Sequence, residues 1–243
     1  MKTYFLKLIV DIGNTRTKVA LFKGKGLIET SNLNACSFDS IRKFVANRKI
    51  STSIISSVKE NNSEIVDVLD HYNGFQLCTN TPVPVKNNYK TINTLGKDRL
   101  AAVVGAFFLY PNKDVLVFDA GTCLTIDYLN RSGEYLGGRI SPGIDMRYKA
   151  LNTFTDKLPL LKKENSTSII GNDTNSSINS GVQRGILAEV SSIISDWKVD
   201  NPDVLAIATG GDCFFFEKEL KSSIFANPDL VMYGLNEILD FNE

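Results

Sequence analysis

The chain has 243 residues, 43% of them hydrophobic and 22% charged, and its 27 basic and 27 acidic residues give a formal net charge of zero. This composition excludes a largely disordered chain, and the length favours two small lobes over one core. Because no excess or cluster of basic residues is present, we expect no nucleic-acid partner and no acidic membrane partner, and a small molecule fits better.

The cysteines and the first residues favour a cytoplasmic protein. Cys36, Cys78, Cys123 and Cys213 are far apart and form no Cys-x-x-Cys pair, which argues against a zinc site and a disulfide framework. Residues 1–8 lack a signal-peptide pattern, and no stretch reaches the ~18 apolar residues that cross a bilayer. We therefore expect a reducing cytosol and no membrane insertion.

The first half of the chain is predicted to start with an antiparallel meander. Alternating apolar residues and glycine turns indicate strands at 4–11, 17–22 and 27–31. Apolar spacing then predicts a helix at 37–48, a strand at 52–58, a helix at 62–72 and a strand at 74–77. After a proline-containing connector, apolar residues at i, i+3, i+4, i+7 and i+8 predict a helix at 97–110 with one buried face.

The second half is predicted to begin in the same way as the first. Strands are expected at 115–119 and 122–129, then a helix at 179–197, a strand at 204–208 and a helix at 230–241. The stretches IVDIGNTRTKVALF and VFDAGTCLTIDYL both run from an apolar strand through Asp-x-Gly to a second strand, about half a chain apart. A duplicated lobe produces such an offset, so we expect lobes at 1–115 and 116–243.

The two Asp-x-Gly turns suit a metal-bound nucleotide. A glycine turn directs several backbone N–H groups into one small space, which suits phosphate. The aspartate before the turn, Asp11 or Asp119, repels phosphate unless a cation such as Mg²⁺ lies between them. One such turn is usually only structural. Two copies, with Thr209-Gly210-Gly211 after a third strand, favour a pair of turns that grip one triphosphate.

Other common catalytic sites are missing from the sequence. It contains no G-x-x-x-x-G-K-[ST] run, no G-x-G-x-x-G turn and no G-x-S-x-G turn. The single histidine, His71, falls near the end of a predicted surface helix, so we interpret it as a solvated residue. Histidine-dependent hydrolase triads are thereby excluded.

The start of the predicted helix at 97–110 offers a site for a phosphate acceptor. Asp98 could simply cap the helix, and Arg99 could simply pair with a surface acid. In phosphoryl transfer, however, a carboxylate need only orient an attacking hydroxyl and accept its proton, because the transition state is loose. The planar fork of Arg99 suits a carboxylate, which indicates an acceptor with a hydroxyl and an acid group.

In their order, these motifs resemble those of type III pantothenate kinases over nearly the whole chain. Gly-x-Asp-Arg together with Asp-x-Gly-Asn-Thr discriminates better than either phosphate turn, which many actin-like ATPases share. The motifs are Asp11-x-Gly13-Asn14-Thr15 with Lys18, Tyr89, Leu95-Gly96-x-Asp98-Arg99, Asp119-x-Gly121-Thr122 with Thr125 and Asp127, Gly137-Gly138-x-Ile140-x-Pro142-Gly143, Leu158-Pro159, Thr174 and Thr209-Gly210-Gly211.

The resemblance implies an α/β protein with a two-lobed actin-like ATPase (ribonuclease H-like) fold, whose duplicated lobes have mixed sheets flanked by helices. It also implies a homodimeric enzyme that binds ATP with Mg²⁺ and phosphorylates pantothenate on the route to coenzyme A. By the same resemblance, Asp98 is the proton acceptor, Asp119 holds a monovalent cation (K⁺ or NH₄⁺), and Thr174 reaches pantothenate across the dimer interface. The other implied contacts are Asp11, Ile12, Gly13, Asn14, Thr15, Arg16, Thr17, Lys18 and Thr122 with ATP, and Tyr89, Gly96, Lys97, Asp98 and Arg99 with pantothenate.

The sequence differs from the usual family pattern at two positions, and two other functions are alternatives to pantothenate phosphorylation. Ile92 stands where relatives often have proline, and Cys123 stands where a small residue is usual. The same fold could phosphorylate a sugar or another small hydroxy compound. Some relatives are named as accessory factors for transcription, a non-catalytic function that the zero net charge and the absence of a basic stripe disfavour.

Overall fold

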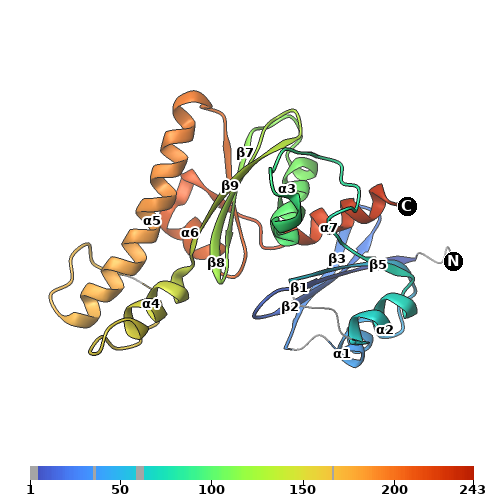
Figure 1. Ribbon diagram of the computed structural model, residues 1–243, viewed down its shortest axis with the longest axis horizontal. Helices are drawn as coiled ribbons and strands as arrows, with labels where there is room; N and C mark the ends of the chain where they lie inside the picture. The colour runs from blue at the N-terminus through green and yellow to red at the C-terminus, as the bar shows by residue number, and fades with distance from the viewer. Residues whose placement is uncertain (1–4, 35–36, 59–62, 166) are drawn as a thin grey trace. The chain divides into compact units, whose positions relative to one another are not determined.

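The computed structural model describes residues 5–34, 37–58, 63–165 and 167–243, and the chain forms two compact units (Figure 1). The first unit contains the chain up to Asn112, together with Leu129–Gly137 and Asp229–Glu243. The second unit contains Lys113–Tyr128 and Gly138–Pro228. The expected element starts at Tyr4 and Asn62, and the cysteine Cys36, lie outside the described residues.

The first unit is built on a five-stranded mixed sheet with the order β3-β2-β1-β4-β5. The meander is antiparallel as predicted, whereas β4 runs parallel to both β1 and β5. Its elements are β1 (Leu6–Ile12), β2 (Thr17–Lys23), β3 (Gly26–Leu33), α1 (Phe38–Val45), β4 (Ile50–Ser57), α2 (Ser63–His71), β5 (Gly74–Gln76), β6 (Lys86–Asn87), a 3₁₀ turn (Ile92–Thr94), α3 (Lys97–Leu109) and α7 (Leu230–Phe241).

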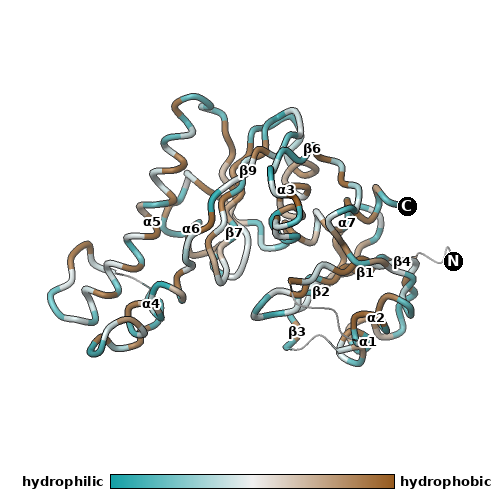
Figure 2. The backbone as a smooth tube through the Cα atoms, in the orientation of Figure 1, coloured by the Kyte–Doolittle hydropathy of each residue, from teal (hydrophilic) through white to brown (hydrophobic). Residues whose placement is uncertain are grey.

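β1 is a central strand that is buried on both faces. Leu8, Ile9 and Val10 are successive residues, which point to alternate faces, and all three are fully buried. Leu8 and Val10 belong to one apolar cluster with residues of α1 and α2, such as Ile41 and Val68. The backbone tube of β1 and β2 is correspondingly hydrophobic in Figure 2. A strand covered on both sides is held firmly, so the turn at its end has a fixed base.

The last helix, α7, packs against α3 of the first unit at two glycines. A Cβ on Gly234 would lie 1.7 Å from the carbonyl oxygen of Ala101, and a Cβ on Gly105 would lie 2.2 Å from that of Leu230. Only glycine permits this approach of two backbones. This contact places the end of the chain in the first unit, unlike the expected division at residue 115.

Ion pairs also connect α7 with the β1–β2–β3 meander. Lys18 of β2 pairs with Asp229 at 2.8 Å, and Lys25 of the β2–β3 turn pairs with Asp240 at 2.9 Å. Lys7 of β1 also pairs with Asp240. The side chains of Lys7, Lys18, Asp229 and Asp240 are largely buried, so these pairs are screened less by salt than fully exposed ones.

The second unit contains neighbouring strands in the order β11-β10-β7-β8-β9, with β10 parallel to both β7 and β11. The chain passes between the units within β9, whose start pairs with β6 in the first unit. The elements are β7 (Val115–Ala120), β8 (Cys123–Leu129), β9 (Glu134–Pro142), α4 (Ile144–Thr153), α5 (Thr174–Asp200), β10 (Leu205–Thr209), α6 (Cys213–Leu220), a 3₁₀ turn (Lys221–Ser223) and β11 (Phe225–Ala226).

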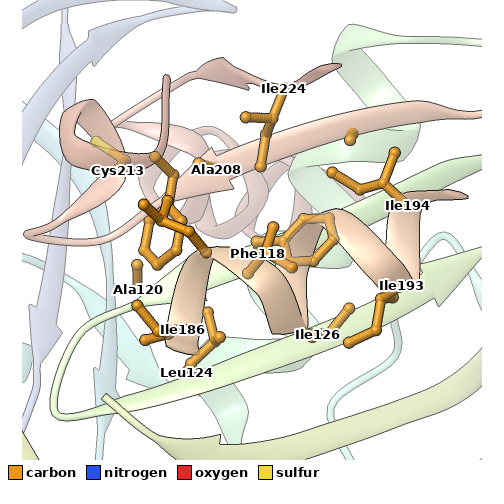
Figure 3. Packing of buried hydrophobic residues seen from close by; sticks show 14 of the residues in the cluster. Phe118, Ala120, Leu124, Ile126, Ile186, Ile193, Ile194, Ala208, Cys213 and Ile224 are labelled. Atoms are coloured by element: carbon orange, nitrogen blue, oxygen red, sulfur yellow. The ribbon is translucent and has the colours of Figure 1, made fainter. Parts of the chain in front are cut away.

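The core of the second unit lies between its strands and α5. Figure 3 shows Phe118 of β7 and Ile126 of β8 beside Ile193 and Ile194 of the helix, and all four side chains are buried. α5 begins at Thr174, earlier than the predicted start, because the side chain of Asp173 caps it. None of the described helices is both long enough and apolar enough to span a bilayer.

Candidate functional site

The turn between β1 and β2 carries the first Asp-x-Gly sequence. The backbone N–H of Gly13 donates to the carbonyl of Arg16 at 3.0 Å, which closes the turn and leaves residues 14–16 exposed. Asp11 and Lys18 are paired residues on the two strands, so their side chains lie on the same face of the sheet. The turn thus presents exposed backbone between a carboxylate and an ammonium group.

The carboxyl group of Asp11 lies in an environment that opposes its charge. Its pKa is raised from 3.8 to about 6, first by burial and then by the negative charge of Asp98. The Ser56 hydroxyl and the charge of Lys18 act in the opposite direction. Asp11 and Asp98, far apart in sequence, are therefore close enough to interact, as the resemblance to a kinase site requires.

The first turn of α3 holds Asp98 in a defined position. Gly96 is the N-cap residue, and the Asp98 Oδ1 atom accepts a hydrogen bond from the backbone N–H of Arg99 at 2.8 Å. A Cβ on Gly96 would lie 2.5 Å from that oxygen, so the Asp98 carboxylate needs glycine at this position. Lys97 donates to the carbonyl of Ser57 at 3.4 Å, which connects the start of α3 with the end of β4.

Three side chains of the first unit form a stack beside Asp98. The guanidinium group of Arg99 lies 5.5 Å from the ring centre of Tyr89, and that ring is parallel to Tyr135 at 6.0 Å. Arg99 is only 5% exposed, so its side chain lies in the interior and not on the surface. A buried guanidinium that is held against an aromatic face is well placed to receive a ligand carboxylate.

The second Asp-x-Gly turn lies in the second unit, between β7 and β8. Gly210 has φ +83°, and a Cβ there would lie 2.4 Å from the Asp119 Oδ1 atom. Gly143 donates its N–H to the Thr122 carbonyl at 3.2 Å, and a Cβ on it would lie 2.6 Å from the same oxygen. The Thr-Gly-Gly and Pro-Gly motifs of the sequence therefore meet at this turn.

Thr174 is an exposed residue at the start of α5, in the second unit. Two large apolar side chains precede it closely, Ile169 at 80% and Ile170 at 82% exposure. Phe154 and Leu160 are exposed in the same connection between α4 and α5. Several exposed apolar side chains in one segment are typical of a surface that another protein covers.

The described residues can contribute to a magnesium site only in part. Among them no group of three or more His, Cys, Asp or Glu side chains could hold a metal by itself. The Asp11 Oδ1 atom, however, is buried and has no hydrogen-bond partner in the described chain. Mg²⁺ usually binds to one or two carboxylates, with phosphate and water as further ligands, so Asp11 fits a metal that arrives with a nucleotide.

β4 was predicted as a strand, but no role was assigned to the serines at its end or to the aromatic partner of Tyr89. Ser56 is the register partner of Asp11, and Ser57 accepts the hydrogen bond from Lys97. The signal was weak, because Ser56 and Ser57 follow Ile54 and Ile55 in a strand that also contains Ser51, Thr52 and Ser53. No local pattern marks Tyr135 as part of the site. His71 is exposed, as expected.

Comparison with known sequences identifies a family. Residues 7–196 match the family described as type III pantothenate kinase. A protein named type III pantothenate kinase from Phocaeicola vulgatus is 44% identical over 240 residues, which cover 98% of this chain and 99% of that protein. One of the same name from Flavobacterium psychrophilum is 38% identical over 241 residues, with 97% and 99% covered.

Solved structures with low identity share the fold. A Campylobacter jejuni protein described as a Baf family transcriptional activator has a TM-score of 0.64 at 22% identity, over 97% of this chain and 98% of that one. The activator of 2-hydroxyisocaproyl-CoA dehydratase from Clostridium difficile, with bound ADPNP, has a TM-score of 0.57 at 14% identity, over 98% and 94%. The two-lobed actin-like ATPase and sugar kinase fold, with mixed sheets flanked by helices, is thereby confirmed.

Proposed function

The chain belongs to the type III pantothenate kinase family, and we propose that it phosphorylates pantothenate with ATP, giving 4'-phosphopantothenate for coenzyme A synthesis. The observation that carries this proposal is the approach of Asp98 to Asp11. It brings the acceptor motif and the first phosphate turn into one site. Membership of a kinase family implies ATP with Mg²⁺ as the phosphoryl donor.

Asp98 is the group that accepts the proton of the pantothenate hydroxyl. Its carboxylate is fixed by the N–H of Arg99 and by the space that Gly96 leaves. A positioned base of this kind contributes about 100- to 10,000-fold to the rate. Because the transition state of phosphoryl transfer is loose, orientation of the hydroxyl matters more than strong basicity.

Arg99 binds the carboxylate of pantothenate, and Tyr89 holds the guanidinium group in place. Lys97 and Gly96 complete this side of the pocket. A buried Arg99 loses little freedom when a ligand binds, because its guanidinium group already lies over the Tyr89 ring. This arrangement favours an acceptor with an acid group and disfavours a neutral sugar.

Residues 11–18 and Thr122 bind the phosphates of ATP. The exposed backbone of residues 14–16 and the ammonium group of Lys18 provide N–H donors and positive charge. Asp11 is the side chain that would hold Mg²⁺, and the ion would supply positive charge to offset that of the phosphates. A protein of the same fold binds ADPNP, which supports a nucleotide here.

Asp119 holds a monovalent cation, K⁺ or NH₄⁺, beside the second turn. Gly210 supports this assignment because it lets the backbone pass against the Asp119 carboxylate. We expect turnover to require K⁺ when Na⁺ is the only other monovalent ion. Equal rates in NaCl and KCl of the same ionic strength would contradict this role.

The active form is a cytoplasmic homodimer in which Thr174 contacts the pantothenate bound by the partner. The exposed apolar residues that precede Thr174 support an interface there, since they would otherwise face water. Sedimentation analysis of Ile170→Asp tests this proposal. We expect the variant to be a monomer with a raised KM for pantothenate.

The direct test of the proposed function is ADP release by the purified protein, coupled to a spectroscopic readout. We expect ADP release that depends on pantothenate. Equal rates without pantothenate would overturn the proposal, and activity with other hydroxy compounds in its place would favour a different small-molecule kinase. Asp98→Asn should keep ATP affinity and lower kcat by ~100-fold or more.

A non-catalytic function in transcription is the second candidate, because the Campylobacter jejuni relative is described as a transcriptional activator. The formal net charge of zero disfavours direct DNA binding. Retention on a DNA column at physiological salt, together with no kinase activity, would favour this candidate.

A further inference from the structure

The end of β4 places the buried hydroxyl of Ser56 beside Asp11. β4 is parallel to β1, and Ser56 is the direct register partner of Asp11. Ser56 is fully buried. It stands one position after Ile54–Ile55, two apolar residues of the core, where a third apolar residue would fit the strand pattern.

Two polar atoms at this point have no hydrogen-bond partner among the described residues: Asp11 Oδ1 and Ser56 Oγ. Both are buried, and buried polar groups destabilise a protein when they are left without a hydrogen bond. The Ser56 hydroxyl lies close enough to lower the pKa of Asp11 as a hydrogen-bonding neighbour, although the two side chains do not meet the standard hydrogen-bond geometry. A small rotation of the Ser56 side chain would let its hydroxyl donate a hydrogen bond to Asp11 Oδ1.

The two oxygens of Asp11 have different surroundings. Oδ1 is buried, whereas Asp11 as a whole is only partly buried. A hydrogen bond to the buried oxygen would fix the rotamer of the carboxylate. The other oxygen would then face the solvent side, where the metal–nucleotide complex binds.

We propose that Ser56 is a positioning residue, whose hydroxyl donates to Asp11 Oδ1 and thereby aims the second carboxylate oxygen at the nucleotide-bound metal. The inference rests on the proposed function, in which Asp11 meets Mg²⁺ and ATP. Partners that orient a metal-binding carboxylate typically change metal affinity by about 10- to 100-fold.

Nucleotide binding with and without metal tests this role. Calorimetry measures the affinity of ADPNP in excess Mg²⁺ and in excess chelator. We expect Ser56→Ala to weaken binding of the magnesium complex about 10-fold and to leave binding of metal-free ADPNP unchanged. Unchanged affinity for the magnesium complex would overturn the proposal.

Ser53 provides a matched control on the same strand. It is fully buried, and its hydroxyl also has no hydrogen-bond partner in the described chain, but its register partner is Leu8. We expect Ser53→Ala to bind both forms of ADPNP like the wild type. If Ser53→Ala lost as much affinity for the magnesium complex, the effect of Ser56→Ala would come from general disturbance of β4, and the proposal would be wrong.

A second variant keeps the test open if Ser56→Ala does not fold. Ser56→Cys has nearly the same volume and a weaker donor, so an intermediate loss is expected, and full wild-type affinity would count against the proposal. A different result is expected if the positioning role is correct but the proposed function is wrong. In that case the Ser56 dependence of magnesium–ADPNP binding persists, but pantothenate is not phosphorylated.

Discussion

At the scale of single residues, Asp11 carries a charge that the folded protein disfavours. Its pKa rises from 3.8 to about 6 on folding, so the folded state favours the protonated form. The resulting stability is complete below about pH 4 and is lost as the pH rises through about 6. An ionised Asp11 therefore lowers the stability of the ligand-free protein at neutral pH.

Asp11→Asn removes this charge. We expect it to raise the free energy of unfolding by about 3 kcal/mol near pH 8, with the gain disappearing towards about pH 4. Urea denaturation of the ligand-free variant and wild type across this range measures the effect. A gain that stays constant with pH would show that the carboxyl group is not the cause.

Gly96 is needed for the position of the Asp98 carboxylate. In Gly96→Ala the new Cβ would lie 2.5 Å from Asp98 Oδ1, so that side chain must rotate away. We expect kcat to fall by at least ~10-fold while ATP affinity is retained, because only the base is displaced. Steady-state kinetics and ATP titration separate the two effects. Gly26→Ala is a control, because its Cβ would lie 3.5 Å from the nearest atom, an ordinary contact.

Arg99 should determine the preference for an acid group on the acceptor. Arg99→Gln keeps a polar side chain but loses the charge and the planar fork. We expect the KM for pantothenate to rise ~10-fold or more. The KM for an analogue whose carboxylate is replaced by an alcohol should change little. Equal rises for both acceptors would show that Arg99 serves the pocket structure and not the carboxylate.

At the scale of elements, the sequence predicted the segments with a clear apolar pattern and missed segments without one. The helix expected at 230–241 is observed as Leu230–Phe241, and the one expected at 97–110 as Lys97–Leu109. α4 and α6 were missed because their apolar residues do not gather on one face. α1 and α2 are equally short and also bury two residues each, but each has one clearly apolar face, which the spacing reveals.

The same limit applies to the site. Asp11 and Asp98 could be found because their motifs are local in sequence and have a chemical reason. Ser56 and Tyr135 could not, because their importance comes from strand register and from a ring stack between distant segments. Such contacts depend on tertiary packing, which spacing along the chain does not encode.

The crossing of α3 and α7 should be highly sensitive to one methyl group. In Gly234→Ala the Cβ would lie 1.7 Å from the Ala101 carbonyl oxygen, so the helices must separate. We expect a loss of about 1–3 kcal/mol or more in the free energy of unfolding, measured with denaturant. Gly185→Ala in α5 is the control, because its Cβ would meet nothing within 4 Å. It should stabilise the helix by about 0.5–1 kcal/mol.

At the scale of the whole molecule, the first unit depends on the far end of the chain. α7 buries five large apolar side chains: Leu230, Met232, Leu235, Ile238 and Leu239. At about 1.5–3 kcal/mol each, their burial is comparable to the entire stability of an ordinary domain. A fragment that ends before α7 lacks this contribution.

A chain that ends at residue 228 should therefore lose the folded first unit. We expect limited proteolysis to cleave it within residues 5–112, with the second unit more resistant. A chain that ends at residue 241 retains all of α7 and is the control, expected to behave like the wild type. Equal protease resistance of the two truncated chains would contradict this prediction.

The return of α7 to the first unit also affects how the protein is made. On the ribosome, N-terminal domains usually fold before later ones emerge. Here the nascent α3 keeps the surface around Gly105 uncovered until α7 has been translated, whereas every residue of the second unit has been synthesised by then. The first unit therefore cannot complete its fold before the whole second unit has been synthesised, and a product that stops before α7 exposes an apolar helix surface to the proteases and chaperones of the cell.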